Sequence, residues 1–319
     1  MKDKRLAGID IGTLTCRLLI ADLVVNGPLK ELRSERRILR LGEGVDRSKR
    51  LTDIAMERVT QCLTEWRAVI DSYSVAASTV VATSAVRDAT NRQEFLDRVK
   101  QTTGFDVELI SGEEEARRTM LGIRSGLPTG VTEVLALDIG GGSTEFILDR
   151  PGHAPILRSI DIGVVRLSER MLQHDPPTHE EVQQAREWIR RETEKAMVAM
   201  PQRGGLTFVG TAGTITSLAA MAQQLQTYEP ARIHNYRLTR ETIAQLEQQL
   251  LARTKAARIG MPGLEKNRED VIAGGAIIIR TIMETLGEQE CLVSDLGLRE
   301  GVLIDLANRR RSRNRIDLV

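Results

Sequence analysis

The sequence is poor in aromatic residues, which make up 3% of its 319 positions, and it has few cysteines and histidines. Because aromatics are scarce, aliphatic side chains must fill the cores of its domains. The three cysteines, Cys16, Cys62 and Cys291, are odd in number and form no CxxC pair, and the four histidines do not cluster. This pattern argues against a zinc site and a disulfide framework, and it favours reduced thiols in a cytoplasmic compartment.

The sequence also lacks a long apolar run and an excess of charge of either sign. No stretch approaches the ~20 apolar residues of a membrane-spanning helix. Asp10 interrupts the apolar run after the basic N-terminus, so no signal peptide is expected. The 45 basic and 44 acidic residues leave a net charge of +1. We therefore expect a cytoplasmic protein without a membrane or specific nucleic-acid partner, in which any site for a polyanion is local.

An aspartate-led loop rich in glycine and threonine occurs twice in the chain. The segment IDIGTLT at 9–15 resembles LDIGGGST at 137–144, with Asp10 and Asp138 in matching places. The offset between the two aspartates is 138 − 10 = 128 positions. Strand-like stretches flank both loops, which predicts that each loop is the tip of a hairpin. The expected strands are Arg5–Asp10, Cys16–Leu23, Glu133–Asp138 and Glu145–Leu148.

A second pair of segments repeats at the same offset. Val81–Ala85 resembles Val209–Gly213, and the matching residues Thr83 and Thr211 are 211 − 83 = 128 positions apart. Two independent motifs with one offset indicate that the chain contains a duplicated unit. Strands alternate with helices in both halves, as expected for an α/β fold. Long helices are predicted after Thr52 and after Thr178.

The boundary between the two halves is predicted near Gly122–Gly130, where the segment GLPTG interrupts the pattern. This gives an N-terminal domain of residues 1–124 and a second domain of residues 125–299. The end of the chain, Asn308–Val319, carries five arginines. This segment is interpreted either as a solvated terminal helix or frayed tail, or as a positively charged segment that attracts a polyanion.

The loops have the composition of phosphate-binding sites. Consecutive glycines let the backbone turn sharply and bring several N–H groups toward one anion, while serine and threonine add hydroxyl donors. No lysine follows the second loop, so the P-loop pattern does not apply. The candidate phosphate-binding residues are Gly12, Thr13 and Thr15 in the first loop, Gly140, Gly141, Gly142, Ser143 and Thr144 in the second, and Gly210, Thr211, Gly213 and Thr214 at the start of a predicted helix.

Three carboxylates, Asp10, Asp138 and Glu145, are candidate oxygen ligands for Mg²⁺. The alternative is that each acid only caps its turn. Arg87 carries a forked donor group suited to phosphate oxygens, although an ordinary surface arginine is the common case. The segment Ser111–Arg117 has three acids at the start of a predicted helix, either to suit the helix dipole or to supply a general base for water.

These residues together resemble the exopolyphosphatase / guanosine pentaphosphate phosphatase family, which shares the wider fold of actin, sugar kinases and heat-shock chaperone ATPases. The resemblance covers almost the whole chain. Its segments are the Asp10 loop, Val81–Asn91, Ile110–Arg117, Asp138–Glu145, Ile162–Leu167, Gly210–Thr214, Asp270–Gly275 and Ser294–Gly301.

The resemblance implies a duplicated actin-like, ribonuclease H-like fold of two lobes with a central cleft, in which the C-terminal helix at 300–319 completes the first lobe. It implies Mg²⁺-dependent release of orthophosphate from inorganic polyphosphate or from guanosine pentaphosphate, a nucleotide of the stringent response. The family's catalytic glutamate matches Glu115, with Glu114 as the alternative. Its phosphate-contacting arginine matches Arg87, and its metal-associated acids match Asp138 and Glu145.

The chain departs from the family pattern at Leu14, where the family usually has an asparagine that can donate a hydrogen bond. It also looks like a short, two-domain member of the family. Two other functions on the same fold stay open: a small-molecule kinase, and a non-catalytic sensor of polyphosphate or nucleotide. The sequence does not give the oligomeric state, and a homodimer is one assembly to test.

Overall fold

The computed structural model describes residues 5–24, 29–200 and 205–316, without the side chains of 313–316. Predictions that concern Met1–Lys4, the side chains of Arg313 and Arg315, and the helix end at 317–319 lie outside this part. The chain forms two compact units, one of residues 1–126 and 296–319 and the other of residues 127–295. No helix in the described ranges is long and apolar enough to cross a membrane.

The first unit is built on a five-stranded sheet with the strand order β3-β2-β1-β4-β5. The strands are β1 (Arg5–Ile11), β2 (Thr15–Asp22), β3 (Lys30–Ile38), β4 (Ala77–Ala82) and β5 (Val107–Leu109). The strands β1, β2 and β3 are antiparallel neighbours, whereas β4 runs parallel to β1 and β5 runs parallel to β4. The first aspartate loop is thus the tip of the β1–β2 hairpin, as predicted.

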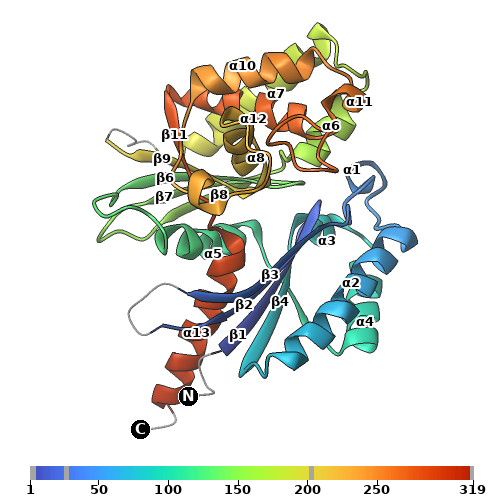
Figure 1. Ribbon diagram of the computed structural model, residues 1–319, viewed down its shortest axis with the longest axis vertical. Helices are drawn as coiled ribbons and strands as arrows, with labels where there is room; N and C mark the ends of the chain where they lie inside the picture. The colour runs from blue at the N-terminus through green and yellow to red at the C-terminus, as the bar shows by residue number, and fades with distance from the viewer. Residues whose placement is uncertain (1–4, 25–28, 201–204, 317–319) are drawn as a thin grey trace. The chain divides into compact units, whose positions relative to one another are not determined.

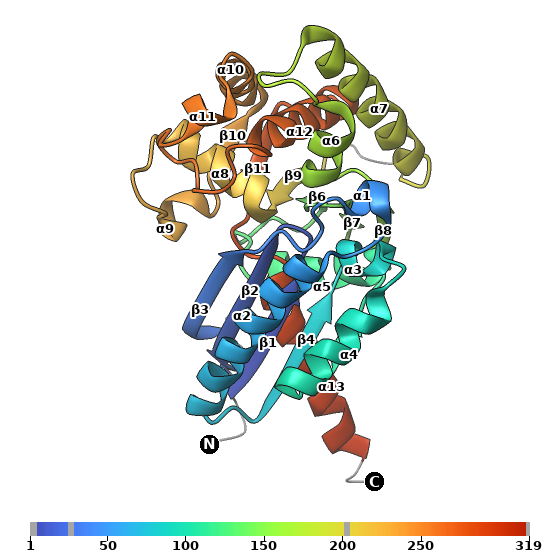
Figure 2. The ribbon, with the colours of Figure 1, turned by 90° about the vertical axis from the view of Figure 1, so that its right-hand side faces the viewer.

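Helices cover both faces of this sheet (Figure 2). The helices of the unit are α1 (Val45–Ser48), α2 (Asp53–Ser72), α3 (Ser84–Asp88), α4 (Arg92–Thr103), α5 (Gly112–Arg124) and α13 (Leu298–Ile316). The helices α2 and α4 lie on one face, and α5 and α13 lie on the other. The α2 helix begins after Thr52, whose hydroxyl accepts a hydrogen bond from the Ala55 amide at 3.2 Å. This is the predicted N-cap.

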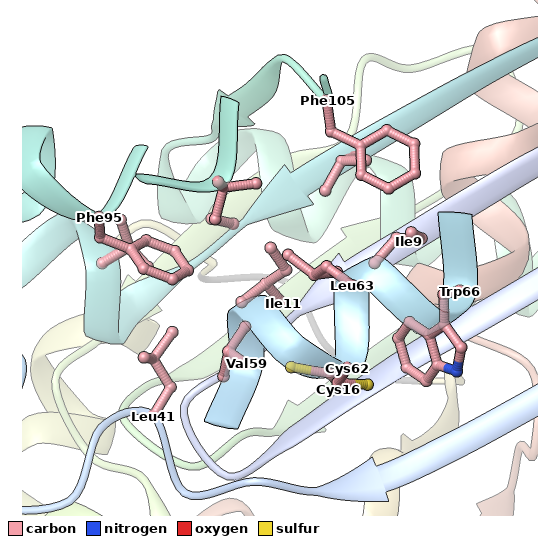
Figure 3. Close-up of a cluster of buried hydrophobic side chains, with 14 of the residues drawn as sticks. Ile9, Ile11, Cys16, Leu41, Val59, Cys62, Leu63, Trp66, Phe95 and Phe105 are labelled. Carbon is pink, nitrogen blue, oxygen red and sulfur yellow. The ribbon is translucent and has the colours of Figure 1, made fainter. Parts of the chain in front are cut away.

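The core on the α2 face is mostly aliphatic (Figure 3). Val59, Leu63 and Trp66 of α2 pack over Ile9 and Ile11 of β1, and all of these side chains are buried. Alternate residues of β1 point to the opposite face, where Leu6 packs against Leu303 of α13. The strand is therefore apolar on both sides, since helices cover both.

The C-terminal helix α13 packs closely against α5 and β1, as Figure 1 shows. Two glycines permit this contact. A Cβ atom on Gly301 would lie 1.7 Å from the carbonyl oxygen of Arg118, and one on Gly122 would lie 1.9 Å from that of Gly297. Any side chain at Gly122 or Gly301 would therefore push the two backbones apart.

The second unit is built on a six-stranded sheet with the order β10-β11-β9-β6-β7-β8. Its strands are β6 (Val134–Ile139), β7 (Thr144–Asp149), β8 (Ile156–Ile160), β9 (Thr207–Thr211), β10 (Arg237–Thr239) and β11 (Glu290–Val293). Its helices are α6 (Val164–Met171), α7 (His179–Met197), α8 (Ala212–Ala222), α9 (Pro230–Ile233), α10 (Arg240–Leu251), α11 (Lys255–Arg258) and α12 (Ile272–Leu286).

The two sheets share one topology. The order β8-β7-β6-β9-β11 repeats β3-β2-β1-β4-β5, with the same parallel and antiparallel pairings, and β10 adds an antiparallel edge strand. The second aspartate loop is the tip of the β6–β7 hairpin, the counterpart of β1–β2. The predicted α/β class and the duplicated actin-like fold are confirmed.

Candidate active site

The first loop is held in place through its backbone. The Gly12 amide donates to the Thr15 carbonyl at 3.0 Å, which closes the hairpin tip. The Thr13 carbonyl accepts from the Gly42 amide at 2.9 Å, and the Leu14 carbonyl accepts from the amides of residues 39 and 40 at 3.0 and 2.9 Å. The Leu14 side chain is 4% exposed and takes no part in these bonds. The segment after β3 therefore fixes this loop whatever side chain stands at position 14.

The tip of the second loop is closed by the equivalent hydrogen bond, but different contacts hold the loop in place. The Gly140 amide donates to the Ser143 carbonyl at 3.0 Å. The Thr144 hydroxyl donates to the Ile162 carbonyl at 2.5 Å, so this hydroxyl is already engaged within the unit. The start of α6 lies directly against the glycines, because a Cβ atom on Gly163 would lie 2.4 Å from backbone atoms of Gly141.

The residues that pair with the two loop aspartates, each within its own hairpin, carry opposite charges. In an antiparallel pair, directly opposed residues point to the same face of the sheet. Asp10 is opposed by Arg17, and Arg17 is opposed by Arg36 on β3. In the second unit, Asp138 is opposed by Glu145. The first unit thus combines one acid with two arginines, whereas the second places two acids side by side.

The acidic pair in the second unit fits a divalent cation. Asp138 is 7% exposed and Glu145 is fully buried, and Glu145 accepts a hydrogen bond from the Ser159 hydroxyl at 2.8 Å. Two opposed like charges destabilise a sheet, so a cation between them lowers the cost. Mg²⁺ commonly binds through one or two carboxylates together with water and phosphate oxygens. In the described ranges no three metal-ligating side chains cluster.

The third predicted segment lies where β9 meets α8, and its two glycines make room for neighbours in the same unit. A Cβ atom on Gly210 would lie 2.6 Å from the Cys291 sulfur, and one on Gly213 would lie 2.2 Å from the Arg268 guanidinium. Ala212, between them, adopts a left-handed φ of 70°. Packing therefore accounts for both glycines, and Arg268 brings a positive charge to the start of α8. The predicted phosphate contacts of Thr211 and Thr214 stay a prediction.

Glu114 and Glu115, the two candidates for the catalytic glutamate, have different surroundings at the start of α5. Glu114 accepts hydrogen bonds from Arg117, at 2.7 Å, and from Arg118, at 2.6 Å. These arginines lower the pKa of Glu114 to about 2. The Glu115 carboxylate instead lies 3.4 Å from Arg87, and its side chain is 10% exposed. The Arg87 guanidinium also donates to the Ile110 carbonyl at 3.0 Å. The structure thus brings Arg87 and Glu115 together, and their role in one catalytic site stays a prediction.

The arginines that bind Glu114 connect α5 to the C-terminal helix. Arg117 donates to Asp305 of α13 at 2.5 Å, and the buried Arg118 lies 3.5 Å from the same carboxylate. Arg118 also donates to Glu108 of β5 at 2.5 Å. The helix that carries Glu115 is therefore held at its first turns by a network of charges.

Comparison with known proteins agrees with this geometry. Residues 19–310 match the Ppx/GppA phosphatase family. The chain belongs to this family. It is 36% identical over 316 residues to exopolyphosphatase 2 of Mycobacterium tuberculosis, covering 95% of this chain and 98% of that protein. The resemblance inferred from the motifs is confirmed.

Two solved structures, a Ppx/GppA family member and an exopolyphosphatase, resemble the chain along almost its whole length. The Aquifex aeolicus family member is 35% identical, with a TM-score of 0.81 and coverage of 96% of this chain and 98% of that one. An exopolyphosphatase from Cytophaga hutchinsonii is 29% identical, with a TM-score of 0.85 and the same coverage.

Sequence reasoning about this Ppx/GppA protein missed several charged residues near the loops. Arg17, Arg36, Arg268 and Arg166 were not singled out, because a single arginine is usually a surface residue. One signal was available for Arg17, since it occupies in the first repeat the place of Glu145 in the second. Arg166 lies within Ile162–Leu167, one of the segments that carry the family resemblance, so it too had a signal. Arg36 and Arg268 become visible only from the sheet register and the tertiary contacts.

Proposed function

We propose that this protein is a Mg²⁺-dependent exopolyphosphatase, which hydrolyses the terminal phosphoanhydride bond of inorganic polyphosphate and releases orthophosphate. The observation that carries the proposal is the pair of the buried Glu115 and the half-buried Arg87, with 3.4 Å between carboxylate and guanidinium. The names of the relatives from Mycobacterium tuberculosis and Cytophaga hutchinsonii support the choice of substrate. Guanosine pentaphosphate is a second substrate to test, because its 5′ end carries the same bond.

The reaction is an in-line attack of water on the terminal phosphorus. Glu115 orients the water and accepts its proton, whereas Glu114, which is bound by arginines and has a pKa near 2, is a weak base. For this reason Glu115, rather than Glu114, is the proposed base. Arg87 and the loop amides stabilise the equatorial oxygens while the bond to the bridging oxygen breaks. The products are orthophosphate and a chain shorter by one phosphate.

Asp138 and Glu145 are the residues that would hold Mg²⁺. When bound, the ion neutralises phosphate oxygens and the charge that develops on them during transfer. Asp10 belongs to the first unit and is opposed by Arg17, so its predicted role as a metal ligand has less support than that of the acidic pair. The Arg17 guanidinium, unlike the Asp10 carboxylate, can donate hydrogen bonds to a phosphate group.

One experiment separates the proposed function from its rivals. Orthophosphate release is measured, with and without Mg²⁺, from long-chain polyphosphate, tripolyphosphate, guanosine pentaphosphate and ATP. We expect Mg²⁺-dependent release from polyphosphate. A kinase would consume ATP only with an added acceptor, and a sensor would bind polyphosphate in calorimetry without releasing orthophosphate. Either of these two results would falsify the proposal.

A further inference from the structure

The start of α6 supports the triglycine loop through the loop's own carbonyl groups. The Val164 amide donates to the Gly140 carbonyl at 3.0 Å, and the Val165 amide donates to the Gly141 carbonyl at 2.9 Å. The next carbonyl, that of Gly142, accepts from the side-chain Nε of Arg166 at 2.7 Å. Three successive peptide groups of the loop are thus each anchored by a donor from α6.

This anchoring determines where the loop's amides point. A trans peptide is planar, so its N–H points away from its C=O. The N–H groups of Gly141, Gly142 and Ser143 therefore point away from α6. Among the residues that the structure describes, none of these three N–H groups donates to a protein acceptor. They are three neighbouring donors available to an anion on the side of the loop away from α6.

The first loop shows what is special about Arg166. The residue equivalent to Gly142 in the repeat is Leu14, whose carbonyl accepts from two backbone amides, those of Leu39 and Arg40. In the described part of the second unit, the only hydrogen bond to the Gly142 carbonyl comes from the Arg166 side chain. In the second unit a side chain thus donates the hydrogen bond to this carbonyl, whereas in the first unit backbone amides donate it.

The surroundings make Arg166 an effective anchor. Its side chain is 6% exposed, so water competes little for the hydrogen bond. A charged donor on a carbonyl polarises the whole peptide, which makes the N–H of Ser143 a stronger donor on the other side. The backbone of Gly163 packs against that of Gly141 so closely that no Cβ atom fits between them.

We propose that Arg166 is a positioning residue for phosphoryl transfer, acting through the Gly142–Ser143 peptide to aim the Ser143 N–H at a phosphate oxygen. This inference rests on the proposed function, because it assigns the loop to a phosphate group of the substrate. It adds a residue on α6 whose contribution comes through the loop and not through contact with the reacting atoms.

The test compares Arg166→Met with Arg170→Met. Arg170 lies on the same helix, is exposed and stacks on Trp188 at 4.8 Å, so its variant makes the same chemical change away from the loop. We expect Arg166→Met to lower kcat for polyphosphate hydrolysis by about 10- to 100-fold with a much smaller change in KM, since misplacing a stabilising group acts on the transition state. Arg166→Lys should recover part of kcat, and Arg170→Met should keep the wild-type value.

A second readout does not depend on activity. In protein labelled with ¹⁵N-serine, the Ser143 amide resonance should shift in Arg166→Met and stay in place in Arg170→Met, without any substrate. Equal kcat in the two variants, or an unmoved Ser143 resonance, would overturn the inference. If the wild type releases no orthophosphate, the proposed function fails, and the resonance together with tripolyphosphate binding in calorimetry still decides the role of Arg166. If Arg166→Met does not fold, Arg166→Lys and Arg166→Gln are compared with Arg170→Met in the same way.

Discussion

Glu114 and Glu115 are adjacent on α5, yet their carboxylates meet arginines from different parts of the fold. Glu114 is bound by Arg117 and Arg118 of its own helix, whereas Glu115 lies against Arg87 of α3. Successive helix residues differ in direction by about 100°, so neighbours face different surroundings. One glutamate therefore ties α5 to the network that reaches α13, and the other is presented beside the candidate phosphate-binding arginine.

The first prediction separates these two roles. Glu115→Gln removes the proposed base and should lower kcat for polyphosphate hydrolysis by about 10²- to 10⁴-fold, with little change in Tm. Glu114→Gln should keep most of kcat and lower Tm, because it leaves Arg117 and the buried Arg118 without that carboxylate. Orthophosphate release and thermal unfolding measure both effects. The opposite pattern, with Glu114→Gln inactive and Glu115→Gln active, would reverse the assignment.

The second prediction concerns the metal. Removing divalent ions with a chelator should abolish orthophosphate release, and added Mg²⁺ should restore it. Mg²⁺ should raise the Tm of the wild type, since an ion that binds only the folded state stabilises it. This increase should be lost in Glu145→Gln and kept in Glu133→Gln, whose carboxylate lies just before β6 and is 47% exposed. A Glu145→Gln protein that still gains stability from Mg²⁺ would show that the ion binds elsewhere.

The third prediction addresses Leu14. Backbone amides already fix its carbonyl, so Leu14→Asn should fold normally while adding a side-chain donor. A new hydrogen bond to a charged phosphate should raise kcat/KM for polyphosphate by about 10-fold. Leu14→Ala, which changes the size of the side chain without adding a donor, serves as the control. If both variants behave alike, the missing donor does not limit the enzyme.

The fourth prediction is a pH dependence of stability. Arg117 and Arg118 lower the pKa of Glu114 from its ordinary value of 4.5 to about 2. A carboxyl group whose pKa is lower in the folded state stabilises the fold above its unfolded pKa and loses that effect as the pH falls. The Tm difference between wild type and Glu114→Gln should therefore be largest near neutral pH and shrink between pH 4.5 and about 2. Circular-dichroism melts across this range measure it, and a constant difference would contradict the prediction.

The fifth prediction concerns the contact between α5 and α13. Gly301→Ala places a methyl group 1.7 Å from the Arg118 carbonyl oxygen, so the helices must separate. Overpacking of this kind costs about 1–3 kcal/mol, more than the ~1 kcal/mol that alanine contributes as a better helix former. Denaturant unfolding should show the loss. Ser312→Ala on the exposed side of the same helix is the control and should be neutral or slightly stabilising.

Local features of the fold were predictable from the sequence. Thr52, Ser111 and Thr178 each cap a helix with a hydrogen bond to the third amide, a preference that acts within a few residues. Glycine patterns likewise identified both hairpin tips. The charged edge strand β3 was not predicted, because its sequence KELRSERRI has no apolar alternation and it is a strand only through its pairing with β2.

The sequence by itself determined that the chain is duplicated, where its two aspartate loops lie and which chemistry they suit. Those properties are carried by residue type and spacing along the chain. Only the tertiary structure decided which of Glu114 and Glu115 meets Arg87, and that Arg166 anchors the triglycine loop. It also showed that Asp138 is opposed by an acid, whereas Asp10 is opposed by Arg17. The Glu115–Arg87 pair and the Arg166–Gly142 hydrogen bond join residues 28 and 24 positions apart, which helix packing brings together. The pairing of the loop aspartates depends on the register of each hairpin.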